Sequence, residues 1–264
     1  MRAKFVIIIL VILMLSPLSV KAELTSPLDK LNEVSDEALQ MVKLQRYDDA
    51  KRLLEYFSAQ FLASARKENS FTMDELRIVS VAHKEALEAA TSSAMNYEER
   101  VNRVTKFRLV VDAVSSTQQP LWTEMEGPVM AAFTNAKEAA YSGNNEDFNF
   151  SLNSFLSLYK VIYPSMKLDI SPDTIEKINA RVDFIDSYRP QVLSQSSSQQ
   201  ELEALQVDLQ NIFDGLTEDE TDPSLWWVII STGSIIIITL SYVGWRKYSG
   251  DREKERNRSR EHKD

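Results

Sequence analysis

The feature that most constrains this chain is an uncharged apolar segment at residues 225–245. It reads LWWVIISTGSIIIITLSYVGW, and no charged residue occurs between Pro223 and Arg246. As a helix, its 21 residues extend about 31 Å, which matches the roughly 30 Å hydrocarbon core of a bilayer. The segment therefore predicts one C-terminal transmembrane helix. Its length and flanks disfavour the alternative of a buried core helix.

The flanks of this segment indicate how it would sit in a membrane. Amphipathic rings and basic side chains favour the headgroup region, so both ends carry expected anchors. These membrane-interface anchors are Trp226, Trp227, Tyr242, Trp245, Arg246 and Lys247. Acidic residues precede the segment and basic residues follow it, and basic flanks normally stay in the cytoplasm. We therefore expect a single-pass cell-membrane protein with an extracytoplasmic N-terminal domain and a cytoplasmic C-terminus.

The N-terminus fits that topology. Arg2 and Lys4 precede an apolar run at residues 5–15, and a small-residue cleavage site ends at Ala22. This order is typical of a secretory signal peptide, which we expect at residues 1–22. An uncleaved anchor is the alternative, and it would make a two-pass protein.

The remaining predicted parts differ in charge. An extracytoplasmic domain at residues 23–216 leads into an acidic linker at 217–224, and a basic tail covers 246–264. Residues 23–224 contain 34 acidic and 19 basic side chains, whereas the tail contains 8 basic and 5 acidic ones. The acidic domain has no basic stripe, so we expect no nucleic acid as a partner. Cysteine is absent, so no disulfide supports the fold.

The extracytoplasmic domain is predicted to be all-α, a helical bundle of about eight helices without a sheet. Apolar residues recur at helical spacing, and glycine is scarce. Capping boxes at Thr72–Glu75 and Ser198–Glu201 indicate two helix starts, and Pro164 is expected to end a helix. The predicted helices lie near residues 27–44, 47–67, 72–87, 96–115, 128–141, 146–163, 171–189 and 198–214.

A breaker region between residues 115 and 128 divides these helices into two groups of four. Residues 23–119 and 120–216 are therefore candidate halves of a duplication. DDAKRLLEYFSAQF, from Asp48, aligns with EDFNFSLNSFLSLY, from Glu146. The alternative is coincidence, because helix periodicity alone supplies most of this match.

One segment, FRLVVDAV at residues 107–114, is apolar around most of its helical circumference and should be buried. Its charged residues, Arg108 and Asp112, are spaced i, i+4 and can therefore meet. We favour a structural ion pair, because a buried charge without a partner is strongly destabilising. A ligand-binding arginine is the alternative. Trp122, just beyond, is interpreted as a core residue or as an exposed interaction anchor.

No residue pattern predicts catalysis, a cofactor or a metal. His83 is the single histidine of the extracytoplasmic domain, and no cysteine or HExxH motif accompanies it. A satisfied helix histidine is therefore favoured over a ligand or a base. No GxSxG elbow and no glycine-rich phosphate loop occur. We expect a protein that is not an enzyme, with no catalytic, cofactor-binding or metal-binding residues.

The chain resembles a known family. FRLVVDAV followed by QPLW, the signal peptide, and the tryptophan-led span before a basic tail are similar to the sporulation protein YpjB family of endospore-forming bacilli. The resemblance covers essentially the full length. It implies a membrane protein of the sporulation programme with no assigned enzymatic activity, and it assigns no catalytic residues.

Three classes of function fit these features. The favoured one is a protein-interaction or scaffold module, which binds a protein partner of unknown identity while the lipid bilayer anchors it. The second is a membrane-tethered sensor or regulator that signals through a partner, because the tail is too short to form a domain. The third is a cell-wall-acting enzyme, which would need convergent acid–base groups that the sequence does not show.

Overall fold

The computed structural model describes residues 27–68, 71–116, 119–217, 230 and 232–248. Every labelled element in these ranges is a helix, so the predicted all-α class is confirmed for them. The predicted signal peptide and most of the predicted linker and tail lie outside the described residues. The chain divides into two compact units, residues 1–206 and 207–264.

The first four helices of the first unit enclose an apolar core. They are α2 (Pro27–Lys43), α3 (Tyr47–Glu68), α4 (Met73–Thr91) and α5 (Tyr97–Ser115). Each turns an apolar face inward, and Leu54, Phe57, Val79 and Phe107 are almost completely buried. The rings of Phe57 and Phe107 meet edge to face, with centroids 4.8 Å apart. Burial of these faces is the main driving force for the packing.

Side chains cap the starts of two helices in this group. Thr72 Oγ1 accepts a hydrogen bond from the Glu75 amide at 3.2 Å, and the Thr72 amide donates to Glu75 Oε2 at 2.6 Å. This reciprocal pair confirms the capping box that opens α4. Asn96 caps α5, because its side-chain oxygen accepts a hydrogen bond from the Glu99 amide at 2.8 Å.

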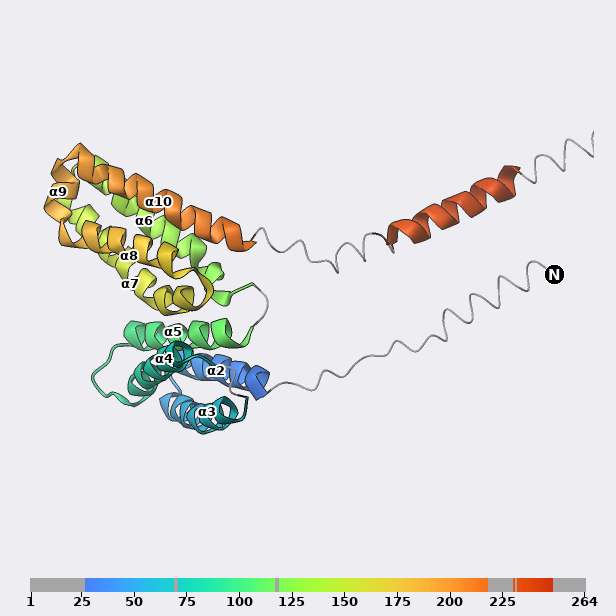
Figure 1. Ribbon diagram of the computed structural model, residues 1–264, viewed down its shortest axis with the longest axis horizontal. Helices are drawn as coiled ribbons and strands as arrows, with labels where there is room; N and C mark the ends of the chain where they lie inside the picture. The colour runs from blue at the N-terminus through green and yellow to red at the C-terminus, as the bar shows by residue number, and fades with distance from the viewer. Residues whose placement is uncertain (1–26, 69–70, 117–118, 218–229, 231, 249–264) are drawn as a thin grey trace, which may run out of the picture. The chain divides into compact units, whose positions relative to one another are not determined.

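The second group follows a short 3₁₀ helix, η1 (Leu121–Met125). It contains α6 (Glu126–Tyr141), α7 (Asn145–Asp169), α8 (Pro172–Ser187), α9 (Arg189–Ser194) and α10 (Ser196–Thr217). α6 packs along α7, and the side chains of Lys137 and Tyr141 on α6 both bind Glu203 of α10, at 3.1 and 2.7 Å. Figure 1 shows α6 and α7 together above α5.

Two predicted boundaries are wrong. Pro164 does not end a helix, because α7 continues through it to Asp169. Proline removes the amide that would serve the Lys160 carbonyl, but the burial of Ile162, Ser165 and Met166 holds this stretch in the helix. Ser198 is not a cap either.

α10 begins earlier than predicted, at Ser196, and the Ser198 and Gln199 amides both donate to the Gln195 carbonyl. The sequence also did not indicate η1 and α9. Both are short, so neither has enough residues to show an apolar periodicity.

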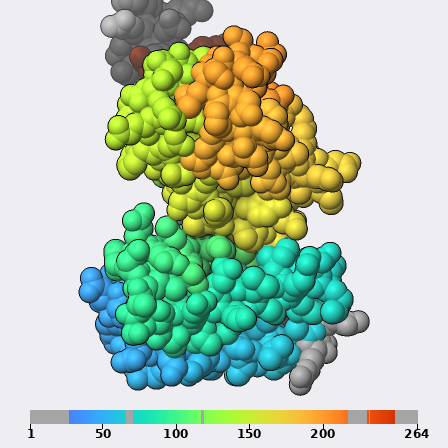
Figure 2. Space-filling view, turned by 90° about the vertical axis from the view of Figure 1, so that its left-hand side faces the viewer, coloured from blue at the N-terminus to red at the C-terminus, as the bar shows by residue number. Residues whose placement is uncertain are grey.

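α5 joins the two groups. It contacts α2 and α4 on one side and α7 and η1 on the other. Its buried residues therefore lie around most of its circumference, and they include Val104, Phe107, Leu109, Val110 and Val111. In Figure 2 the surface of α4 and α5, drawn in teal to green, meets the yellow surface of α7 along an indented seam.

The packing order of the two groups is partly alike. α2 contacts α3 and α5, as α6 contacts α7 and binds α10 through Glu203. α9 has no counterpart among α2–α5. The proposed halves, residues 23–119 and 120–216, and their duplication stay a prediction.

Candidate functional site

Arg108 and Asp112 lie where α5 meets α2. Their side chains are only 12% and 10% exposed, and Arg108 Nη1 lies 3.5 Å from Asp112 Oδ1. Arg108 also donates to Asn32 Oδ1 at 2.6 Å, and its Nε lies 3.4 Å from Asp36 Oδ1. The arginine therefore ties α5 to α2, and its donors are directed at side chains of the protein itself.

Asp112 also organises the start of η1. Its Oδ2 accepts a hydrogen bond from the Leu121 amide at 2.8 Å. The next residue, Trp122, is completely buried, and its indole Nε1 donates to Asp169 Oδ2 of α7 at 2.8 Å. Trp122 is therefore a core residue, and its interpretation as an exposed interaction anchor is wrong. A buried indole with its one donor satisfied internally has nothing left to offer a partner.

The Trp122 contact holds the Asp169 carboxyl group inside this junction. Burial raises the pKa of Asp169 to about 6, the Trp122 hydrogen bond opposes that rise, and the negative charge of Asp112 adds to it. One polar chain thus runs from α2 through Arg108 and Asp112 to η1, and from η1 through Trp122 to α7. It connects the two helical groups at one end of α5.

His83 has a structural role. Its Nε2 lies 2.8 Å from the Leu54 carbonyl oxygen, and its ring stacks on Phe57 with centroids 5.8 Å apart. The ring edge also meets Phe107. Within the ranges that the structure describes, no group of three or more His, Cys, Asp or Glu residues is placed to hold a metal ion.

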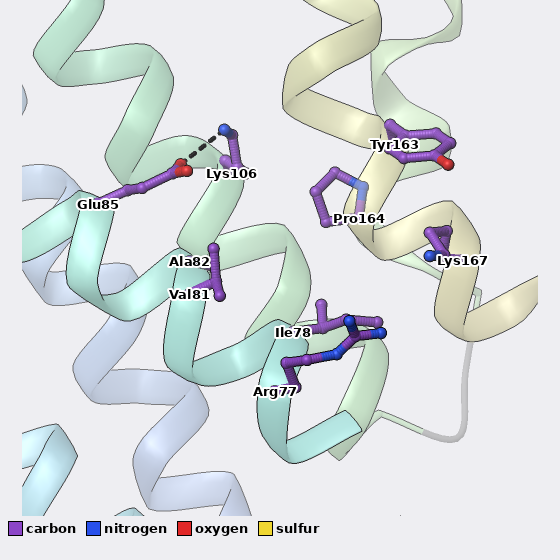
Figure 3. A pocket seen from close by; sticks show the side chains of 9 residues that line it. All are labelled: Arg77, Ile78, Val81, Ala82, Glu85, Lys106, Tyr163, Pro164 and Lys167. Atoms are coloured by element: carbon purple, nitrogen blue, oxygen red, sulfur yellow. Dashed lines mark hydrogen bonds and ion pairs between the residues drawn. The ribbon is translucent and has the colours of Figure 1, made fainter. Parts of the chain in front are cut away.

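The candidate site is a groove between α4, α5 and α7. We call it the α4–α7 groove, and the cavity between its α4 and α7 walls has a volume of about 230 Å³. Figure 3 shows its α4 and α7 walls facing each other across this space. Its lining residues are Arg77, Ile78, Val81, Ala82, Glu85, Lys106, Tyr163, Pro164 and Lys167.

A second hollow of about 330 Å³ continues the groove between α5 and α7 and shares Lys106 with the first. It is lined by the cations Lys160 of α7 and Arg103 of α5 and by the carboxylates Glu98 and Glu99 of α5. The α4–α7 groove thus follows α7 for at least two helical turns. Sequence reasoning missed it because its walls come from three helices that are separate in the chain.

The groove combines apolar walls with basic side chains. Val81 is 53% exposed although it is aliphatic, and Pro164 faces it from α7. Lys106 Nζ binds Glu85 Oε2 at 2.7 Å, and Lys167 Nζ lies 5.8 Å from the centre of the Tyr163 ring. Apolar walls with a few polar groups among them are typical of a surface that binds a ligand or a partner.

The predicted membrane anchors are only partly described. Trp226 and Trp227 lie outside the described residues. Tyr242 and Trp245 lie on a helix at residues 232–248, where they are 57% and 67% exposed, and Arg246 and Lys247 are also exposed there. No helix in the described ranges is long and apolar enough to cross a membrane.

The Arg108 contacts generate a stability prediction. Arg108→Leu should lower the free energy of unfolding by about 3 kcal/mol, because it leaves the nearly buried Asp112 carboxylate without its cation. Adding Asp112→Asn removes that charge but keeps an acceptor for the Leu121 amide, so the double variant should lose only about 1 kcal/mol. Urea unfolding followed by circular dichroism measures both.

Arg52→Leu is the matched control, because Arg52 forms an ion pair on the surface, where it is 73% exposed. Its loss should cost less than about 1 kcal/mol. Equal losses from Arg108→Leu and Arg52→Leu would show that the Arg108 pair does not stabilise the helix junction.

Asp169 generates a pH prediction. Its pKa in the folded chain, about 6, lies above its ordinary value of 3.8, so the native state holds a proton that the unfolded state has lost. That contribution to stability is present below pH 4 and is lost as the pH rises through 6. Asp169→Asn keeps an acceptor for Trp122 and cannot ionise. Its free energy of unfolding should therefore fall less between pH 5 and pH 7.5, by on the order of 1 kcal/mol.

Unfolding curves at the two pH values test this prediction. Glu124→Gln, at an exposed position of η1, should keep the pH dependence of the unchanged chain. An unaltered pH dependence in Asp169→Asn would contradict the raised pKa.

Comparison with known proteins now identifies the family. The family model described as sporulation protein YpjB (SpoYpjB) matches residues 28–257. The chain is also 34% identical over 260 residues to a Bacillus subtilis (strain 168) protein named "Uncharacterized protein YpjB", with 98% of each chain covered. No solved structure matches the chain significantly. These matches confirm the resemblance, and the chain belongs to the sporulation protein YpjB family.

Proposed function

We propose that this member of a sporulation family is a membrane-anchored interaction protein. Its extracytoplasmic helical domain binds a protein partner, and its C-terminal apolar segment holds that domain at the cell membrane. The tail stays in the cytoplasm. Family membership supports the link to sporulation. The anchor and the binding role are supported by two surfaces of the chain.

The helix at residues 232–248 carries the argument for the anchor. Ile235, Ile236, Ile237 and Ile238 are consecutive, and each is more than half exposed. Consecutive helical residues point about 100° apart, so this apolar surface surrounds the helix instead of forming one stripe. A helix that is apolar all round is stable inside a protein core or a membrane, not in water. The start of the predicted span, residues 225–229 and 231, lies outside the described residues.

The α4–α7 groove supports the binding role. Its cavity is open to solvent, yet Ile78, Val81, Tyr163 and Pro164 give it apolar walls. Exposed apolar surface rimmed by charged side chains is typical of a site that a partner covers. The proposal therefore assigns binding to the helical domain and attachment to the C-terminal segment.

A protease-protection experiment tests the topology. Protease added to intact protoplasts of sporulating cells should digest the helical domain and spare an epitope tag placed after residue 264. A cytoplasmic marker protein should remain intact as the control. Digestion of the tag with protection of the domain would contradict the proposed orientation. Release of the whole chain from membranes by a high-salt wash would contradict the anchor.

A segment exchange separates anchoring from signalling. Replacing residues 225–245 with an unrelated apolar span of equal length should preserve both membrane localisation and recovery of the partner, because the segment acts as an anchor. Loss of function with normal expression and topology would instead favour a regulator that signals through the membrane.

A further inference from the structure

We infer that the α4–α7 groove binds an acidic segment of a partner protein, whose carboxylates pair with Lys160 and Lys167 of α7. This inference rests on the proposed interaction role and adds the chemistry of the partner to it. It is carried by three observations: the spacing of these lysines, their lack of carboxylate partners, and the apolar surface between them.

The first observation is a stripe along α7. Lys160, Tyr163, Pro164 and Lys167 follow the spacing i, i+3, i+4, i+7 and therefore share one face of the helix. All four line the two hollows that form the α4–α7 groove. The two lysines are exposed, and their backbone positions lie about 10 Å apart along the helix. This face thus presents a cation at each end of an apolar centre.

The second observation is that these two cations are not neutralised by the protein. Among the described residues, no carboxylate pairs with Lys160 or Lys167, and Lys167 only lies over the Tyr163 ring. The cations of α5 differ: Lys106 binds Glu85 at 2.7 Å, and Arg103 binds Glu88 and Glu99 at 2.9 and 2.6 Å.

The negative charge of the whole chain makes the lack of carboxylate partners at Lys160 and Lys167 informative. The whole chain has a formal net charge of −9, so acidic side chains are plentiful. Glu98 and Glu99 line the same hollow as Lys160, but Glu99 pairs with Arg103, and among the described residues no ion pair joins a carboxylate to either α7 lysine. Basic side chains in a groove of an acidic protein attract a negatively charged partner and orient it there. Arg77, on the α4 wall, adds a further positive charge to the groove. Its ion pair with Asp74 is exposed and therefore weak.

The third observation is the apolar centre of the groove. Ile78, Val81 and Ala82 of α4 face Tyr163 and Pro164 of α7 across a cavity of about 230 Å³. An inorganic phosphate or a phosphate headgroup would satisfy the lysines and leave this apolar surface in water. A polypeptide can place an aliphatic side chain there and carboxylates on both sides.

The lysine spacing specifies the partner further. Two carboxylates about 10 Å apart on one face correspond to acidic residues seven positions apart on a helix, or three apart on a polyproline II segment. We therefore expect an Asp or Glu on each side of an aliphatic or aromatic residue.

A peptide-selection experiment tests this inference. The full-length chain, held in phosphatidylcholine nanodiscs, is used to select binders from a display library of random short peptides at physiological salt. The enriched peptides should contain an apolar residue between acidic residues at one of the two spacings. Lys160→Glu/Lys167→Glu should weaken the binding of a selected peptide by about tenfold or more, because both contacts become repulsive.

Two matched variants control for fold and for net charge. Lys30→Glu/Lys43→Glu changes two exposed lysines of α2, outside the groove, by the same total charge and should keep full affinity. Lys160→Arg/Lys167→Arg should also bind, since it retains both charges. Thermal unfolding of all variants should match that of the unchanged chain, because both α7 lysines are exposed.

The outcomes distinguish failure of the groove assignment from failure of the proposed interaction role. Enriched peptides that bind Lys160→Glu/Lys167→Glu unchanged would overturn the groove assignment and leave the interaction role standing. Failure to enrich any peptide would also overturn the inference, whereas the interaction role would be contradicted only if the full-length chain recovered no partner protein from sporulating cells. Lysine-dependent binding of phosphatidylglycerol vesicles in place of peptides would assign the groove to lipid. Lysine-dependent self-association would assign it to a second copy of this chain. Either result would overturn the inference.

Discussion

The burial of α5 is the constraint on which the rest of the helical domain depends. Two residues of its apolar run, Phe107 and Val110, are completely buried, and α5 is the element that contacts α2, α4, η1 and α7. Arg108 and Asp112 lie in the covered part of α5, where they are 12% and 10% exposed, so both charges need partners. Arg108 and Asp112 meet that need with contacts to α2 and η1. Trp122 of η1 in turn binds Asp169 of α7, so these contacts connect α5 with one wall of the α4–α7 groove.

The helical class and most of the helices could be predicted because the signals are local. Thr72 and Asn96 cap α4 and α5 through residues three positions away. Pro164 also gives a local signal, but this signal was misleading. Its local preference is to end a helix, and burial of the neighbouring residues in the tertiary structure overrides that preference.

The candidate site was not predictable in the same way, because its residues meet only after the helices pack. Lys167 and Arg77 are 90 positions apart in the sequence, yet both line the same cavity. Arg100 was missed as well. It is only 6% exposed and donates to the carbonyls of Ala89, Ser92 and Met95 around the C-terminal end of α4. The one available signal for the groove was the spacing of Lys160, Tyr163, Pro164 and Lys167 along α7.

Hydrogen–deuterium exchange of the full-length chain in nanodiscs tests the central position of α5 most directly. Amides that open only when the whole domain unfolds exchange slowest, whereas helices at an edge open locally and exchange faster. If α5 is the shared core of both helical groups, the amides of residues 104–112 should be the slowest of the domain. They should be slower than those of α2 and α8. Exchange of residues 104–112 at the rate of α2 or faster would contradict this account, because it would show that the two groups do not depend on α5.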